Sequence, residues 1–408
     1  MSPHWLSKDR LIIYPAAFLV IYLSMVLFLL ARFPAGVDQR GHTLTPDFVV
    51  FWGASHLALS GDPQGAYDPV TVAAAERLTI RHLSATGDWI YPPTFYLMIV
   101  PLALLPFFWS YVAFMASTFL AFLWVVRRAA ATTLALMPVL GFPGACLNFI
   151  QGQNGFLTAA LCGGALLLLP RRPIWAGVLI GLLIIKPQLG LLLPLALVCG
   201  RHWHALFAAA VTALMFLTVS VLALGPETMQ AFFGHLGGFS AWAASNRNLL
   251  LSVPTFFSFF RLLGLAASPA LLIHGALALA IAIATGWIWR VCPNMALRSA
   301  TLVVATLMVS PYLLDYDLVW LALAIAWFAS YAVRHGWRSG EREMLVLAWL
   351  LPLCMTLIHR LLQVQLAPFI LLGLFLMMLR RVREDRMRGE AGKDVRLDDR
   401  NAYSSISP

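Results

Sequence analysis

Charged residues are scarce in this sequence. Asp, Glu, Lys and Arg make up only 11% of its 408 residues, whereas 61% are hydrophobic. Soluble domains usually carry about 25% charged residues. Because no soluble core could bury this much apolar side chain, the composition excludes a cytosolic enzyme, a disordered protein and a disulfide-stapled secreted module. The mean hydropathy of +0.81 instead indicates a polytopic membrane protein.

Patterned cysteines and metal-ligand motifs are also lacking. The five cysteines show no Cys-x-x-Cys spacing, so neither a zinc site nor a disulfide framework is indicated. The Asp-x-Asp of Asp315 and Asp317 is too isolated to indicate a metal–diphosphate site. The sequence therefore predicts no metal requirement and no cofactor. It also lacks the His-Glu-x-x-His and Gly-x-Gly-Asp motifs, which argues against an intramembrane protease.

The net charge of +10 does not come from a basic patch with interleaved aromatic residues, so nucleic acid is not an expected partner. Lys and Arg stand mostly at the ends of apolar runs, where they keep those ends in the cytoplasm. The run 11–31 is long enough to span a membrane, and no small-residue cleavage site follows it. We therefore expect an uncleaved first span, both termini in the cytoplasm and about twelve crossings.

These patterns predict an all-α polytopic protein of the inner (plasma) membrane. Residues 1–380 are expected to form one transmembrane domain, and 381–408 a charged, disordered cytoplasmic tail. The polar segment 33–91 is predicted to be a first external loop, and 226–267 a second. No acidic residue stands in the middle of an apolar run, which disfavours the alternative function, a transporter or flippase for a lipid-linked or small substrate.

The first external loop is predicted to be structured. Apolar residues recur at helical spacing over 47–59 and about 70–84, which indicates two amphipathic helices on the outer membrane surface. Asp47 follows Pro46 in the first turn of the first helix, where a carboxylate also interacts favourably with the helix dipole. Asp47 is therefore either a helix cap or a functional carboxylate.

The order of several short motifs resembles glycosyltransferase family 87, over about residues 10–380. The motifs are DFxxFW at 47–52, SGDPxxxYDP at 60–69, YPPTF at 91–95, GQNG at 152–155 and AGVLIGLLIIKPQLG at 176–190. The resemblance implies a GT-C fold and a polyprenyl-phosphate-linked sugar as donor, with mannose or another hexose transferred. It also implies a lipid-linked or cell-envelope glycan acceptor and reaction at the outer, periplasmic face among membrane lipid. A catalytic carboxylate is implied just after the first span, a position that Asp47 matches.

Transfer from a lipid phosphate needs a base and a group that meets the charge of the departing phosphate. We expect Lys186, at the tip of an apolar hairpin, or Arg247, in the second external loop, to pair with this phosphate. Alternatively, Lys186 is a lysine that snorkels to the membrane interface and Arg247 a solvated loop residue. Asp315 and Asp317 either accept from sugar hydroxyls or hold a basic partner such as Arg247. The candidates for binding the sugar or acceptor are Gln153, Asn154, Gln188, Asn246, Asn248, Tyr316 and Asp317.

Overall fold

The computed structural model describes residues 5–32, 45–79, 87–130, 132 and 135–404, and every regular element among them is a helix. The all-α expectation is confirmed. The first ten α-helices are α1 (Arg10–Arg32), α2 (Pro46–Leu59), α3 (Pro69–Thr79), α4 (Pro93–Ile99), α5 (Phe107–Ala130), α6 (Leu136–Leu140), α7 (Pro143–Gln151), α8 (Gly155–Leu168), α9 (Pro173–Leu182) and α10 (Leu192–Cys199). They are followed by α11 (Trp203–Leu224), α12 (Pro226–Ser245), α13 (Arg247–Ser252), α14 (Phe256–Leu262), α15 (Ala267–Val291), α16 (Met295–Val309), α17 (Leu321–His335), α18 (Glu341–Leu362) and α19 (Ala367–Ser404). Short 3₁₀ helices are η1 (Pro63–Tyr67), η2 (Val100–Leu104), η4 (Leu183–Ile185), η5 (Pro187–Leu189) and η6 (Asp315–Trp320).

Several helices are suited to a membrane. Among the described residues, five stretches are long and apolar enough to cross one: Arg10–Phe28, Phe107–Ala130, Trp203–Leu224, Ala267–Val291 and Asp315–His335. Other apolar runs are divided into shorter helices. The run 92–106 forms α4 and η2, and the run 130–149 is divided between α6 and α7 at Pro143, because proline lacks the N–H that a continuing helix needs. The membrane class is supported, and the count of about twelve crossings stays a prediction.

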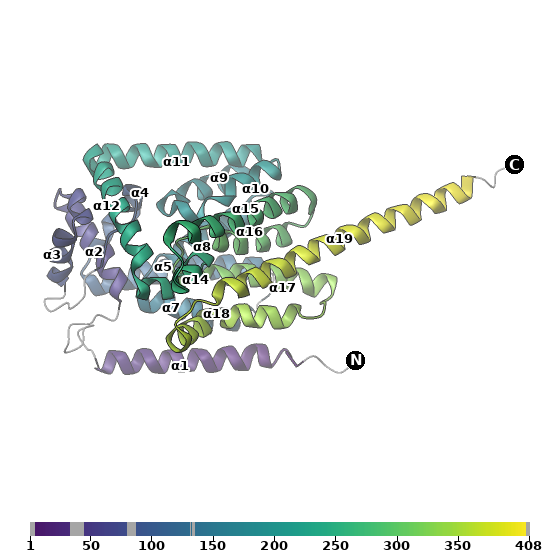
Figure 1. Ribbon diagram of the computed structural model, residues 1–408, viewed down its shortest axis with the longest axis horizontal. Coiled ribbons are helices and arrows are strands. Elements are labelled where there is room, and N and C mark those ends of the chain that lie inside the picture. Colours follow the sequence, from purple (N-terminus) through teal and green to yellow (C-terminus); the bar gives the residue numbers. More distant parts are fainter. Residues whose placement is uncertain (1–4, 33–44, 80–86, 131, 133–134, 405–408) are drawn as a thin grey trace.

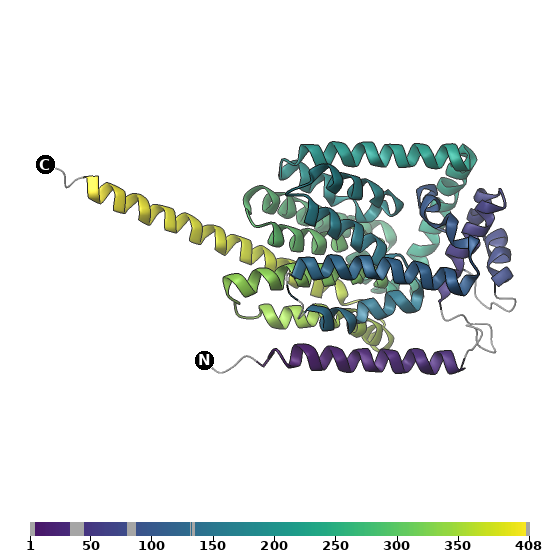
Figure 2. The ribbon, with the colours of Figure 1, turned by 180° about the vertical axis from the view of Figure 1, so that it is seen from behind.

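The bundle has two distinct ends. The long helices, such as α5, α11 and α17, run along the length of the molecule, while α2, α3 and α12 gather at one end (Figure 1). Both views show α19 leaving the bundle at the opposite end, where α15 connects to α16 and α17 to α18 (Figure 2). We call these the α2 end and the α19 end.

Helix α2 is more deeply buried than the sequence predicted. Its first two turns have buried residues on every side, including Phe48, Val49 and Val50. A helix lying on the outer membrane surface would bury one face only. Helices α3, α4, α5, α7 and η2 all pack against α2, so the expectation of an amphipathic surface helix was wrong for α2. Helix α3 does have one buried face, formed by Val72, Ala73, Ala75 and Glu76.

The bundle also continues past the boundary predicted at residue 380. Helix α19 runs without a break through Arg381, whose guanidinium is buried and bonds to both oxygens of Glu341 at 3.0 and 3.1 Å. Asp385, one turn later, is paired with Arg338 at 2.5 Å. These contacts fasten the first part of the charged segment to α18 and to the α17–α18 connection, so the packed domain extends to about Asp385.

Candidate functional site

Lys186 lies at the break between two halves of an apolar hairpin. Helix α9 and η4 lead into it, and η5 and α10 leave from it. The backbone departs from helical geometry at Lys186 (φ −144°, ψ 70°), because the residue before a proline is disfavoured in the α conformation. The predicted hairpin break is therefore present.

The Lys186 ammonium is directed inward. Its side chain is only 4% exposed, and Nζ lies 2.6 Å from Oδ1 of Asp317. Nζ also lies 4.4 Å from the centre of the Tyr316 ring, a cation–π geometry. A snorkelling lysine would carry its ammonium to the membrane surface, so this geometry argues against that interpretation.

The Gly-Gln-Asn-Gly motif forms the turn between α7 and α8. Gly152 ends α7 with φ +72°, and a Cβ on it would lie 2.6 Å from Cβ of Phe48 in α2. A Cβ on Gly155 would lie 3.0 Å from the carbonyl oxygen of Tyr316 in η6. Glycine is needed at both positions, for backbone conformation at the first and for close approach at both. The motif thereby holds Gln153 between α2 and η6.

Gln153 connects several buried polar groups. Its Nε2 donates to Oδ2 of Asp47 at 2.8 Å, while its Oε1 accepts from the Tyr91 hydroxyl at 2.8 Å and from the Asn154 amide at 3.2 Å. Because Oε1 is occupied by two donors, the amide can present only its NH₂ to Asp47. The Tyr91 hydroxyl is in turn 3.4 Å from the Tyr316 hydroxyl. A continuous polar chain therefore leads from Asp47 to the ring that stacks on Lys186.

Asp47 is partly buried at the start of α2. The N-cap of this helix is Thr45, and no side-chain capping bond is present there. Burial raises the pKa of the Asp47 carboxyl, and the hydrogen bond from Gln153 and the positive charge of Lys186 partly oppose this rise. A carboxylate with a raised pKa is a better proton acceptor than an ordinary surface aspartate.

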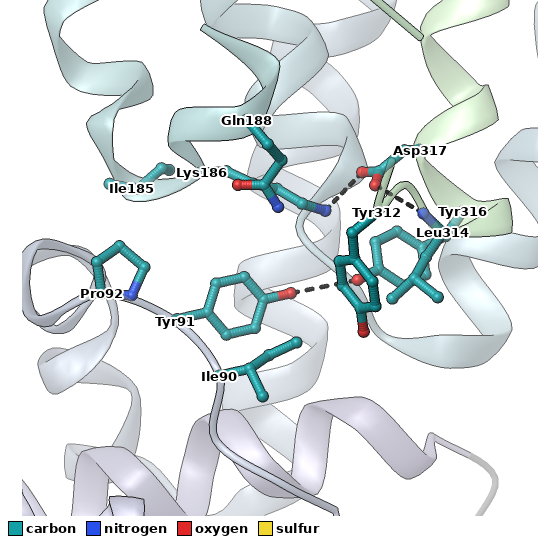
Figure 3. Close-up of a pocket in the computed structure, with 10 residues that line it drawn as sticks. All are labelled: Ile90, Tyr91, Pro92, Ile185, Lys186, Gln188, Tyr312, Leu314, Tyr316 and Asp317. Carbon is teal, nitrogen blue, oxygen red and sulfur yellow. Dashed lines mark hydrogen bonds and ion pairs between the residues drawn. The ribbon is translucent and has the colours of Figure 1, made fainter. Parts of the chain in front are cut away.

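A small cavity adjoins these groups (Figure 3). Its volume is about 30 Å³, and it is lined by Ile90, Tyr91, Pro92, Ile185, Lys186, Gln188, Tyr312, Leu314, Tyr316 and Asp317. One water needs a cavity of roughly 10–15 Å³, whereas ligand pockets usually measure about 300–1,000 Å³. The cavity must widen before it can hold a sugar.

The structure distinguishes the two aspartates of η6. Asp317 holds a basic partner, but this partner is Lys186 rather than Arg247, and its Oδ2 accepts from the Leu314 amide at 3.3 Å. Asp315 accepts from Nε2 of Gln151 at 3.2 Å and from the Tyr316 amide at 2.8 Å. Asp317 is therefore ion-paired, and contact of either aspartate with sugar hydroxyls stays a prediction.

The candidates of the second external loop lie away from this cavity. Asn246 caps α13 by accepting from the Leu249 amide at 3.0 Å. Arg247 is exposed and donates to the Gln363 carbonyl at 3.2 Å, and Asn248 is also exposed. None of the three lines the cavity.

Among the other candidates, Gln188 lines the cavity. Asn154 is fully buried, and neither atom of its side-chain amide has a hydrogen-bond partner among the described residues. Tyr91 and Tyr312 were not predicted as site residues. The Tyr-Pro-Pro motif pointed to Tyr91 as the opening of a span, without indicating that its hydroxyl faces Gln153; no pattern pointed to Tyr312.

Comparisons with known proteins relate more than half of this chain to one family. Neither the curated proteins nor the solved structures contain a significant match to the chain. The family comparison matches residues 89–311, more than half of the chain, to glycosyltransferase family 87. Tyr91, Gln153 and Lys186 fall inside this range, while Asp47 precedes it and Asp317 follows it. The match confirms the resemblance carried by the motifs, and the chain belongs to glycosyltransferase family 87.

Proposed function

We propose that this protein is a GT-C-type membrane glycosyltransferase that moves a sugar from a polyprenyl-phosphate donor to a lipid-linked or cell-envelope glycan. The sugar is mannose or another hexose. Family membership supports glycosyl transfer, and the apolar helices support a membrane location. The observation that carries the proposal is a buried polar chain from the Asp47 carboxylate to the Lys186–Asp317 pair. It runs through Gln153, Tyr91 and the Tyr316 ring.

Asp47 is the proposed general base. The acceptor hydroxyl oxygen attacks the anomeric carbon of the donor, the bond from that carbon to the phosphate oxygen breaks, and Asp47 takes the hydroxyl proton. Gln153 is assigned to orienting Asp47 rather than to binding sugar, because both ends of its amide are occupied. A fixed carboxylate with a raised pKa suits this role.

Lys186 is the proposed partner of the departing phosphate, which gains negative charge as it leaves. An ammonium group has three donors. One bonds to Asp317, so two remain available for phosphate oxygens at the cavity. This cation can supply the charge stabilisation that a metal supplies elsewhere, which supports metal-independent transfer. Arg247 is the weaker candidate because it lies outside the cavity wall.

The sugar and acceptor are assigned to the cavity wall. Gln188, Tyr316 and Asp317 line it, and the unpartnered amide of Asn154 offers further hydrogen-bonding capacity close to Gln153. Asn246 and Asn248 would reach a bound substrate only if it extends beyond the cavity toward α13.

The α2 end is proposed to face the outside of the inner membrane, with both termini in the cytoplasm, because arginines concentrate at the α19 end. Single cysteines at the exposed positions 68 and 171, in a cysteine-free variant, test this orientation. An impermeant thiol reagent applied to intact cells should label position 68 and leave position 171 unlabelled; the reverse pattern would invert the topology.

The function is tested by comparing glycolipids and surface polysaccharides of a strain that lacks the gene with strains complemented by the native chain or by Asp47→Asn. Only the native chain should restore the missing glycan. The purified protein in detergent, supplied with polyprenyl-phosphate mannose and the lipid extract of the deletion strain, should form a new glycosidic bond. Movement of labelled lipid across vesicles without any transfer in detergent would instead support a flippase.

A further inference from the structure

A second cavity lies between α15 and α19, away from the candidate active site. It measures about 420 Å³ and is lined by Ala280, Ile283, Ala284, Trp287, Leu379 and Arg383. The α15 wall belongs to a stretch suited to crossing a membrane, and Ile283 within it is 64% exposed. An exposed apolar wall of this kind is suited to the hydrocarbon of a bilayer rather than to water.

The two walls of this groove are arranged in the same way. On α15, Ile283, Trp287 and Arg290 follow one another at spacings of four and three residues, which places them on one face of the helix. On α19, Leu379 and Arg383 are four residues apart. Along each wall, apolar residues are followed by an exposed arginine. The arginines lie toward the α19 end, where α19 leaves the bundle (Figure 1).

The arginines of this end differ in their partners. Arg338, Arg380 and Arg381 are all paired with carboxylates. Among residues whose side chains the structure describes, neither Arg383 nor Arg290 is within ion-pair distance of a carboxylate. The two acidic residues that follow Arg383, Glu384 and Asp385, pair with the other three arginines instead. The positive charge at the end of the groove is left without a counter-charge from the described side chains.

An apolar groove that ends in unpaired guanidinium groups matches a ligand with an acyl chain and an anionic head. Tryptophan at such a position is typical of the membrane–water interface, and basic pockets between membrane helices bind anionic headgroups. We propose that this groove binds an anionic glycerophospholipid of the bilayer, with one acyl chain along Ile283 and Trp287. Its phosphate bonds to Arg383, and Arg290 contributes a second positive charge. The lipid occupies the leaflet opposite the Asp47 site, so this inference does not rest on the proposed function.

Native mass spectrometry of the full-length purified protein tests the proposal, with phosphatidylglycerol and phosphatidylcholine of equal chain length as probes. The native protein should retain phosphatidylglycerol in preference to phosphatidylcholine. Arg383→Gln should weaken this retention by at least about tenfold, the value of one charge-assisted contact. Ala280→Phe should also weaken it, because the ring fills the groove while the net charge stays unchanged.

Arg334→Gln is the matched control, since Arg334 is an exposed arginine at the same end of the bundle but outside the groove. It should retain phosphatidylglycerol as the native protein does. Equal weakening by Arg334→Gln and Arg383→Gln would reduce the effect to general charge attraction and overturn the proposal. Equal retention of the two phospholipids, or preferential retention of undecaprenyl phosphate, would also overturn it. Size-exclusion profiles establish that each variant is folded.

Discussion

The Lys186–Asp317 pair near the α2 end and the Arg381–Glu341 pair at the α19 end are equally inaccessible. Their side chains are 4% and 1% exposed in the first pair and 2% and 0% in the second. They differ in how many hydrogen-bond partners the cation has. Arg381 bonds to both oxygens of Glu341, to Asp385 and to two backbone carbonyls. Among the described residues, the Lys186 ammonium makes one hydrogen bond, to Asp317, and it faces a cavity.

The comparison shows that spare hydrogen-bonding capacity distinguishes the candidate active site from a structural ion pair more clearly than burial does. A saturated guanidinium cannot bind a further anion without losing an existing partner. An ammonium with unused donors beside a cavity can bind a phosphate, and the neighbouring tyrosine ring keeps the charge favourable without using a donor. We therefore expect the α19-end network to hold helices together and the Lys186 network to act on substrate.

The largest effect is expected for Asp47→Asn. Asparagine keeps the shape of the side chain and can still bond to Gln153, but it cannot take a proton. General base catalysis contributes about 10²–10⁴-fold, so transfer by the purified variant should fall by that factor. Expression should be unchanged. The free energy of unfolding should change by about 1 kcal/mol or less, since helix-dipole contributions are of that size. Normal transfer by a well-folded Asp47→Asn protein would reduce Asp47 to a structural residue.

The next effect separates the two ion pairs. Lys186→Ala should slow transfer by removing about 3–4 kcal/mol of transition-state stabilisation. Lys186→Arg should recover part of the lost rate because the positive charge returns. Both assays are expressed per folded protein, because loss of Lys186 leaves Asp317 unpaired. Arg381→Ala is the control: it should lower the free energy of unfolding by about 3–5 kcal/mol while the remaining folded protein transfers sugar normally. Equal specific activities of Lys186→Ala and Arg381→Ala would remove the functional distinction between the pairs.

Glu76 extends the comparison to a buried carboxylate without an ion pair among the described residues. Within the described part of the chain, its carboxylate oxygens accept only from the Gly87 amide, at 3.3 Å. Burial raises the pKa of Glu76 to about 7. The folded state therefore binds this proton more tightly than the unfolded state, so stability falls as pH rises from about 4.5 toward 7. Glu76→Gln should raise the free energy of unfolding at pH 8 by on the order of 2 kcal/mol and change it little at pH 4. Thermal unfolding at both pH values measures this, and an equal shift at both would contradict it.

The smallest effect is expected for Gln153→Leu. Losing the amide removes an interaction that lowers the pKa of Asp47, so this pKa should rise further. Transfer needs ionised Asp47, and the acidic limb of the rate profile should therefore move to higher pH, with about a tenfold loss near the native optimum. Gln153→Glu is a second variant to compare. A carboxylate beside Asp47 should also raise the pKa of Asp47 and move the acidic limb to higher pH. A lower rate with an unmoved limb would assign Gln153 to substrate binding instead.

Much of the architecture could be predicted from local patterns. Low charge and long apolar runs predicted a helical membrane protein, and the Lys186-Pro187 break predicted a hairpin tip. Helix ends at prolines followed from the missing N–H. The burial of α2 could not be predicted, because its apolar residues fit a membrane-surface helix as well as a helix enclosed by neighbouring elements.

The sequence by itself determined which residues could do chemistry, including Asp47, Lys186 and the Gly-Gln-Asn-Gly turn. These could be identified because hydropathy, and the backbone effects of proline and glycine, are local to one helix or turn. Only the tertiary structure decided which of them meet. Asp317 lies 131 residues from Lys186 and Asp47 lies 106 from Gln153, and such pairings depend on which helices pack together. Arg247 remained an alternative phosphate partner to Lys186 until packing placed it outside the cavity. Hydrogen bonds act over about 3 Å, so a site is selected by the final positions of the side chains rather than by their types.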